Sequence, residues 1–256
     1  MTALVTGAAR RIGREIALCL ARRGHDVAIH YHGSAEAAEA TAAEARAAGV
    51  RAVTLAADLL DEDQTAALVG RAAAALGPLT VLVNNASIFE YDTLHSATRD
   101  SWNRHIGSNL RAPFQLIQAF AAQAPAAGTQ DGEPVATALV VNMIDQRVLK
   151  PTPEFMTYSL AKAGLWALTR TAAQALAPAI RVNAIGPGPT MQGARQSADH
   201  FARQRAATVL GRGADADDIV AALGYLLDAR AVTGQLICVD GGQHLGWRTP
   251  DVLGPE

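Results

Sequence analysis

The chain has 256 residues, of which half are apolar, 5% are aromatic and 18% are charged. This composition is typical of a packed globular protein and excludes an intrinsically disordered chain. The formal charge is −2, with acidic and basic residues spread along the sequence, which argues against a nucleic-acid or anionic-membrane partner. No apolar run approaches the roughly 18 residues of a membrane span.

Short β-branched segments alternate along the chain with longer, alanine-rich amphipathic segments. Strands are expected in the short apolar segments, at residues 3–6, 26–31, 52–56, 80–84, 138–144, 180–184 and 235–239. Helices are expected in the segments with helical periodicity, at residues 11–21, 35–48, 63–76, 106–122, 155–177 and 215–228. This alternation indicates βαβ units and a parallel sheet with helices on both faces. We therefore expect one α/β domain over residues 1–256, built on a doubly wound parallel sheet.

Two stretches interrupt the alternation. The polar residues 128–134 are expected to form a surface loop before the fifth strand. The segment from 186 to about 213 is too long for a simple connection, so residues 187–213 are a candidate substrate lid. The N-terminus shows no secretory signal, and Cys19 and Cys238 lie in apolar contexts, which favours free thiols in the reducing cytoplasm.

A glycine-rich turn at residues 6–13 (TGAARRIG) joins the first strand to the first helix. Ligands of doubly wound sheets bind beyond the carboxyl ends of the strands, where this turn lies. Gly7 permits a tight turn, Gly13 permits close packing, and the helix N-terminus then faces a pyrophosphate. The alternative is an ordinary turn. The remaining expected cofactor contacts of the turn are Arg10, Arg11 and Ile12.

The second strand runs into residues 30–34 (HYHGS), and no carboxylate follows until the next helix has begun. A fold that prefers NADH places an acid there for the ribose 2′-hydroxyl. His32 and Ser34, with the Arg10–Arg11 pair nearby, instead favour a 2′-phosphate, so we predict NADPH as the cofactor. Asp58, just past the third strand, is expected either to accept a hydrogen bond from the adenine amino group or to cap a helix.

Tyr158 and Lys162 lie four residues apart in a helical segment and therefore share a face. A phenol has a pKa near 10, and an adjacent ammonium lowers such a pKa by roughly 1–3 units. A phenol with a lowered pKa is a good proton donor for a group that accepts a hydride. The alternative is an unrelated pair on a helix surface.

Several motifs together resemble the short-chain dehydrogenase/reductase family, over about residues 2–245. They are residues 6–13, Asn84-Asn85-Ala86, Tyr158xxxLys162, Pro187-Gly188 and the ending at residues 233–242. The resemblance implies a Rossmann-type domain with a seven-stranded parallel sheet. It implies that Tyr158 is the catalytic acid, that Lys162 lowers its pKa and holds the nicotinamide ribose, and that Asn109 positions a proton-relay water. A helix kink is the alternative for Asn109. Further expected cofactor contacts are Asn85, Ala86, Pro187 and Gly188.

Two departures from the family pattern bear on the substrate. Asp145 stands 13 residues before Tyr158, where the family usually has a serine. A carboxyl group there donates a proton when neutral, or accepts hydrogen bonds from ring N–H and amino groups when charged, which suits a nitrogen heterocycle. A capping or loop role is the alternative. Arg11 replaces a glycine of most relatives, and its guanidinium is expected to reach both a cofactor phosphate and the substrate.

The segment after the fourth strand adds Ser87, where most relatives have glycine, and Phe89, which is expected to stack a flat ring against the nicotinamide. A core position is the alternative for Phe89, and Phe155 is either a pocket wall or helix packing. With Arg11 and Asp145, these residues resemble the pteridine reductase branch. That resemblance implies a pterin between the nicotinamide and Phe89, its polar edge surrounded by Ser87, Arg11, Asp145 and Tyr158.

One mismatch with that branch concerns the cofactor. Gly33 stands where the branch can carry an arginine, so Ser34 and His32 must contribute more and NADPH affinity is expected to be weaker.

The sequence thus predicts an NADPH-dependent reductase of a pteridine-type ring, with no metal. The alternatives are a general carbonyl reductase for 3-oxoacyl thioesters or sugar ketones, and a non-enzymatic NADPH sensor. The family resemblance implies a homotetramer built through residues 106–122, 155–177 and the C-terminal strand. The tail at residues 247–256, with Arg248, is expected either to reach a neighbouring subunit's site or to be disordered.

Overall fold

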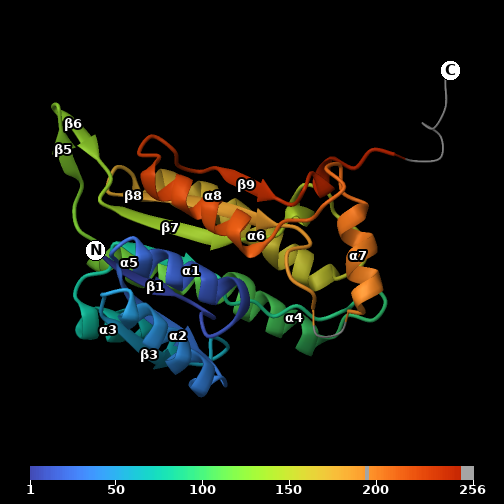
Figure 1. Ribbon diagram of the computed structural model, residues 1–256, viewed down its shortest axis with the longest axis horizontal. Coiled ribbons are helices and arrows are strands. Elements are labelled where there is room, and N and C mark those ends of the chain that lie inside the picture. Colours follow the sequence, from blue (N-terminus) through green and yellow to red (C-terminus); the bar gives the residue numbers. More distant parts are fainter. Residues whose placement is uncertain (194–195, 249–256) are drawn as a thin grey trace.

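A seven-stranded parallel sheet forms the centre of the computed structural model, which describes residues 1–193 and 196–248 (Figure 1). The strands follow the order β3-β2-β1-β4-β7-β8-β9. Their bounds are β1 (Thr2–Val5), β2 (Asp26–Tyr31), β3 (Ala52–Ala56), β4 (Val81–Asn84), β7 (Ala138–Met143), β8 (Ile180–Pro187) and β9 (Leu236–Val239). The order reverses between β1 and β4, which places a ligand-binding crevice at their carboxyl ends. The predicted doubly wound sheet of seven strands is confirmed.

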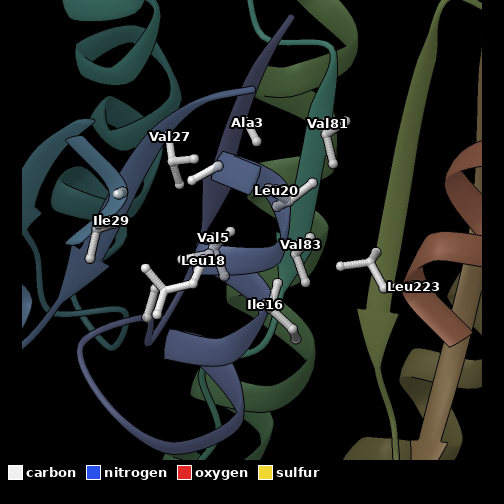
Figure 2. Close-up of a cluster of buried hydrophobic side chains, with 14 of the residues drawn as sticks. Ala3, Val5, Ile16, Leu18, Leu20, Val27, Ile29, Val81, Val83 and Leu223 are labelled. Carbon is white, nitrogen blue, oxygen red and sulfur yellow. The ribbon is translucent and has the colours of Figure 1, made fainter. Parts of the chain in front are cut away.

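Helices cover both faces of the sheet, with one large hydrophobic core on each face. One core joins the sheet to α1 (Arg11–Arg22), α2 (Ala35–Ala47) and α8 (Ala216–Asp228), and part of it is drawn in Figure 2. The other joins it to α3 (Glu62–Leu76), α5 (Ala112–Gln123) and α6 (Met156–Leu176). Successive residues of β1 alternate between them, since Ala3 and Val5 belong to the first core and Leu4 to the second. Burial on both faces is the reason why the strands are continuous apolar runs.

The predicted helix at 106–122 begins earlier and changes its winding. α4 (Arg99–Ile106) comes first, a π-helical turn η1 (Gly107–Arg111) follows, and α5 completes the run. Only His105 is buried in α4, so that segment lacks the apolar stripe by which a helix is recognised in a sequence.

The surface loop predicted at residues 128–134 is wrong. The segment forms an antiparallel hairpin of β5 (Gly128–Gln130) and β6 (Glu133–Val135), which projects beyond the sheet (Figure 1). Asp131 and Gly132 at its tip have φ angles of 54° and 83°. A two-residue hairpin turn of the mirror-image type requires positive φ at both positions, and Asp-Gly is a strong signal for it.

The segment predicted as an irregular lid contains a helix, α7 (Ala198–Ala206). Short 3₁₀ turns, η2 (Gln146–Val148) and η3 (Gln243–Leu245), lie beside the same end of the sheet. Within the described residues, no helix has the length and apolarity needed to span a membrane. The same part of the chain has no cluster of three or more His, Cys, Asp or Glu side chains suited to a metal ion.

Candidate active site

Three cavities that share lining residues lie beyond the carboxyl ends of β1, β4, β7 and β8. The turn cavity, of about 500 Å³, follows the glycine-rich turn toward His32 and Asp58. The tyrosine cavity, of about 260 Å³, is lined by Tyr158 and Lys162. The loop cavity, of about 240 Å³, lies against residues 187–193 and 196–204. Arg11 and Ile12 line all three, so the three cavities adjoin one another.

The glycine-rich turn approaches neighbouring backbone too closely for side chains. Gly7 has a φ of 61°, and a Cβ there would lie 3.0 Å from Ala86 Cα. A Cβ on Gly13 would lie 2.2 Å from the Gly7 oxygen and 2.5 Å from Asn85 Nδ2. Both predicted glycine roles, the tight turn and the close packing, are therefore found in the structure.

His30, in β2, holds this turn in place through a hydrogen bond, a role that the sequence did not reveal. Its Nδ1 accepts a hydrogen bond from the Gly7 N–H at 3.0 Å, and its Nε2 lies 3.1 Å from the Ala57 oxygen, to which it donates. The side chain is 2% exposed, and burial lowers its pKa from 6.5 to about 4. The ring is therefore neutral near pH 7, with its proton on Nε2. A histidine at the end of an apolar strand was the available signal.

Arg11 adopts a backbone conformation that favours glycine, with a φ of 57°. For another residue this left-handed conformation costs roughly 1–2 kcal/mol. Its guanidinium crosses the site and donates to the backbone oxygens of Gln192 at 2.8 Å and Met191 at 3.0 Å. The side chain thus lies over the cavities as expected, and its partners belong to the candidate lid.

The far end of the turn cavity holds the residues predicted for the adenosine half of the cofactor. His32 Nδ1 lies 3.7 Å from Asp58 Oδ1, and Arg10 lines the same cavity. Asp58 does not cap a helix, because the N-cap of α3 is Asp61. Ser34, at the N-cap of α2, is not among the residues that line the turn cavity.

Asn85 and Ala86 join the ends of β4 and β1. Asn85 Nδ2 donates to the oxygens of Thr6 at 2.9 Å and Gly7 at 3.1 Å. The Ala86 N–H donates to Thr6 Oγ1 at 3.0 Å. The Asn85 side chain therefore braces the turn, and Asn85 also lines the turn and tyrosine cavities.

Tyr158 and Asp145 meet in the tyrosine cavity. Tyr158 Oη donates to Asp145 Oδ2 at 2.9 Å, while Asp145 Oδ1 accepts from the Arg147 N–H at 2.9 Å. The capping alternative for Asp145 is therefore confirmed, since one oxygen caps η2, while the other oxygen accepts from the tyrosine.

The expected lowering of the Tyr158 pKa by Lys162 is wrong for this structure. Burial raises the pKa of Tyr158, and the charge of Asp145 and its hydrogen bond raise it further. Arg147 and Ser87 lower it by less. The phenol is consequently held in its protonated form, with its proton directed at Asp145.

Lys162 is a buried cation, 2% exposed, whose Nζ donates to the Met143 oxygen at 2.8 Å. Its Nζ lies 5.7 Å from the centre of the Tyr158 ring. Burial lowers the pKa of Lys162 from 10.5 to about 8. Burying a charge is unfavourable, so an ammonium in this place lowers the stability of the fold. Its presence here points to a functional role.

Phe89 is 43% exposed and lines the tyrosine and loop cavities, so it is not a core residue. Its ring stacks on Phe155 with 4.3 Å between centroids and meets Tyr158 edge-on at 4.7 Å. The Arg147 guanidinium lies 5.4 Å from the Phe89 centroid and 4.8 Å from that of Phe155. Phe155 is thus the neighbour that orients Phe89.

Asn109 lies inside the π-helical turn η1 and is fully buried. Its Nδ2 donates to the Ile88 oxygen at 2.8 Å, and its Oδ1 accepts from the Ile88 N–H at 2.9 Å. The helix irregularity that was the alternative for Asn109 is therefore confirmed. Both polar groups of its side chain hydrogen-bond the Ile88 backbone, so Asn109 holds the segment that follows β4.

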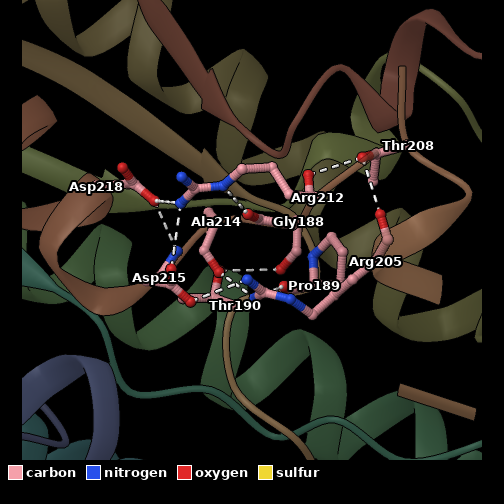
Figure 3. Close-up of polar contacts among 10 residues, drawn as sticks. Gly188, Pro189, Thr190, Arg205, Thr208, Arg212, Ala214, Asp215 and Asp218 are labelled. Atoms are coloured by element: carbon pink, nitrogen blue, oxygen red, sulfur yellow. Dashed lines mark hydrogen bonds and ion pairs between the residues drawn. The ribbon is translucent and has the colours of Figure 1, made fainter. Parts of the chain in front are cut away.

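The candidate lid is fastened at its base. Figure 3 shows Arg205 of α7 between the oxygens of Pro189, at 3.1 Å, and Ala214, with Asp215 beside it. Arg212 bonds Asp215 and Asp218 at the start of α8. Pro187 and Gly188, the predicted cofactor contacts, line the tyrosine and loop cavities at the foot of this segment.

The C-terminal segment lies against the turn after β7. Lys150 Nζ donates to the Gly246 oxygen at 3.1 Å, and Gln243 lines the loop cavity. Trp247 is 61% exposed and carries the Arg248 guanidinium over its ring. Of the tail whose role was considered above, residues 249–256 lie outside the described residues.

The comparisons with known proteins agree with this geometry. A family model described as "Enoyl-(Acyl carrier protein) reductase" matches residues 7–244. The chain belongs to the short-chain dehydrogenase/reductase family. Among curated relatives, it is 34% identical to the 3-oxoacyl-[acyl-carrier-protein] reductase FabG of Staphylococcus aureus strain Mu50, over 95% of this chain and 98% of that one.

Two solved structures of the family are similar over almost the whole chain. FolM alternative dihydrofolate reductase 1 from Brucella suis, in complex with NADP, is 43% identical with a TM-score of 0.90, covering 98% of each chain. A short-chain dehydrogenase from Burkholderia cenocepacia J2315, in complex with NADP, is 34% identical with a TM-score of 0.85, covering 94% of this chain and 96% of that one. The predicted family and oxidoreductase class are confirmed.

Proposed function

We propose that this chain is an NADPH-dependent reductase that delivers a hydride to a pteridine-type ring. The observation that carries the proposal is the hydrogen bond from Tyr158 to Asp145 in a cavity that Phe89 also lines. A carboxyl group there accepts hydrogen bonds from ring N–H and amino groups, which a plain ketone lacks. The 43% identity to the FolM structure supports the same substrate class.

The turn cavity fits a dinucleotide. Gly7 and Gly13 leave no space for a Cβ, so backbone N–H groups at the start of α1 line the place of a pyrophosphate. We propose that Arg10 and Arg11 bind its phosphates and that Asp58 faces the adenine. The similar structures that carry NADP in their names support NADPH. The remaining proposed contacts are Ile12, His32, Ser34, Asn85, Ala86, Pro187 and Gly188.

NADPH, when bound, supplies the hydride, and the chain's own residues handle the proton. Tyr158, kept protonated by burial and Asp145, donates its proton to the reduced ring. Lys162 holds the nicotinamide ribose. Asp145, Ser87 and Arg11 bind the polar edge of the ring. Asn109 contributes by holding the segment that follows β4.

The second candidate is a general carbonyl reductase for 3-oxoacyl thioesters. The observation that favours it is the 34% identity to FabG over nearly the whole of both chains. A keto group has no N–H to offer Asp145, so replacement of this residue distinguishes the two activities.

The test is NADPH oxidation with dihydrobiopterin, dihydromonapterin, dihydrofolate and a simple ketone side by side. Asp145→Ser should lower pterin turnover at least tenfold and change ketone turnover by less than threefold. Asp217→Ser, at an exposed position of α8, is the control and should alter neither. Equal pterin rates in the Asp145→Ser variant and the unaltered protein refute the pterin assignment. NADPH binding without oxidation of any substrate supports a sensor instead.

The number of subunits and the cellular compartment are part of the same proposal. We propose a single domain that functions as a homotetramer in the cytoplasm. Phe114 of α5 and Leu160 of α6 are large apolar side chains exposed at 39% and 47% on the helices predicted to form the interfaces. Cys19 and Cys238 are both free thiols, as a reducing compartment favours. Light scattering during gel filtration measures the number of subunits.

A further inference from the structure

Residues 88–92 follow the carboxyl end of β4, and their side chains alternate between more exposed and more buried positions. Phe89 and Tyr91 are exposed at 43% and 57%, and both contact the Phe155 ring. Asp92 between α4 and α6 is 2% exposed. The exposed aromatic residues therefore form a surface at the site, while the alternating inward residues are half-buried (Ile88 and Glu90) or buried (Asp92).

Each of the inward residues is tied to a different helix. The Ile88 backbone pairs with Asn109 of η1. The Glu90 N–H donates to Nε2 of His105 in α4 at 3.1 Å. Asp92 binds the start of α6, where its Oδ1 accepts from the Thr157 N–H at 3.1 Å and its Oδ2 accepts from Thr157 Oγ1.

The last two ties form one directed chain of hydrogen bonds. A backbone N–H can only donate, so His105 Nε2 accepts from Glu90 and the ring proton is on Nδ1. This proton is directed at Thr157 Oγ1, 2.6 Å away, and the Thr157 hydroxyl donates in turn to Asp92. Burial would raise the pKa of Asp92, but the hydrogen bonds from Thr157 hold it below its usual value. Burial lowers the pKa of His105, in accord with a neutral ring.

Asp92 takes the place of an N-cap for the helix that carries Tyr158. The residue at the N-cap of α6, Phe155, has no side-chain acceptor and a φ of 54°. The orphan N–H of Thr157 in the first turn is satisfied instead by Asp92, 65 residues earlier. The negative charge at this helix N-terminus is also favourable. Tyr158 is the next residue along the helix.

We propose that Asp92, Thr157 and His105 are positioning residues that hold Phe89 and Tyr158 at a fixed spacing. The two rings lie 4.7 Å apart, one on each of the segments that this network joins. A displacement of about 1 Å at a reacting group can lower a rate by roughly 100-fold. The nature of the substrate rests on the proposed function, but the network itself does not.

The sharpest test compares Thr157→Val, which keeps the shape and removes the hydroxyl, with Thr157→Ser, which keeps the hydroxyl. Thr157→Val should lower kcat for dihydropterin at least tenfold and change the Kd for NADPH by less than twofold. Thr157→Ser should restore kcat to within threefold of the unaltered protein. Thr171→Val, at an exposed position of α6, is the matched control and should keep full activity.

Unchanged kcat in folded Thr157→Val, or an equal loss in Thr157→Ser, overturns the proposal. Should Thr157→Val not fold, Asp92→Asn replaces it, because the amide keeps one acceptor for the Thr157 N–H and loses the other. Amide hydrogen exchange at Glu90 and Thr157 is measured in parallel and should accelerate at least tenfold in Asp92→Ala, which removes both acceptors of Thr157. This measurement requires no substrate. If the protein reduces no pterin, only the proposed function is refuted. If the exchange rates are unaltered, the proposed positioning role of Asp92, Thr157 and His105 is refuted.

Discussion

Protonation of His30 should lower the stability of the fold by an amount that its burial determines. Its pKa is about 4 in the folded protein and 6.5 in an exposed chain. Between pH 6.5 and pH 4 the unfolded state therefore binds one more proton than the folded state, and the free energy of unfolding falls as the pH falls. The difference of about 2.5 units corresponds to about 3 kcal/mol at 1.36 kcal/mol per unit. Above pH 6.5 the contribution is constant, and below pH 4 no more is lost.

Urea unfolding from pH 7.5 to pH 4 measures this slope, with two variants as references. His30→Asn can keep an acceptor toward Gly7, and His30→Gln can keep a donor toward Ala57. Each variant should be less stable than the unaltered protein at pH 7.5, by about 1–3 kcal/mol, because one buried group loses its partner. The gap should close by about 3 kcal/mol as the pH falls to 4, since the other titrating groups cancel in the difference. A gap that stays constant with pH would refute the view that a neutral imidazole holds the glycine-rich turn.

Three further replacements test the electrostatics and the fastening of the site. Lys162→Met should abolish turnover yet raise the free energy of unfolding at pH 7 by about 1–3 kcal/mol, because it removes a buried charge whose pKa burial lowers to about 8. Stability of the unaltered protein should also rise between pH 8 and pH 10.5, where its unfolded state binds the extra proton, and urea unfolding that shows neither effect contradicts the assignment. Asn109→Leu leaves both Ile88 backbone groups without partners and should lower the free energy of unfolding by about 2–4 kcal/mol, measured with urea. Asn109→Asp should lower it by roughly half as much. Equal losses in the two variants would contradict the pair of hydrogen bonds to Ile88. Arg11→Gly should change the free energy of unfolding by less than about 1 kcal/mol, since relief of the left-handed backbone offsets two exposed hydrogen bonds. Amide hydrogen exchange of residues 190–193 should nevertheless accelerate severalfold, and unchanged exchange would show that Arg11 does not hold this segment.

The strands and most helices were predictable because burial imposes its period on the sequence. β2 and β3 coincide with the apolar runs at residues 26–31 and 52–56. α4 was not predictable in this way, because its one buried side chain, His105, leaves no apolar stripe. The hairpin after α5 was concealed by its polar composition, although its Asp-Gly turn is a recognised signal.

The site divides along a similar line. Tyr158, Lys162 and Asp145 were found because their spacing matches a family motif, and the structure brings them into one cavity. His30 and Asp92 act on Gly7 and Thr157, which are 23 and 65 residues away, and nothing in their local sequence marks those partners. The direction of the Tyr158 pKa depends on how deeply the phenol is buried, a quantity that no spacing reports.

The hydrogen bond from Tyr158 to Asp145 must also be replaced before any substrate can receive the tyrosine proton. In the resting protein the phenolic proton is directed at a neighbour of the tyrosine, so a hydride acceptor must first draw this proton away. When the Tyr158 hydroxyl turns toward the substrate, Asp145 loses a hydrogen bond. A ring that donates its own N–H to Asp145 replaces that bond. A simple ketone offers no such replacement and leaves a partly buried acceptor without a donor. Discrimination between substrates would then arise before hydride transfer, in the exchange of a single hydrogen bond.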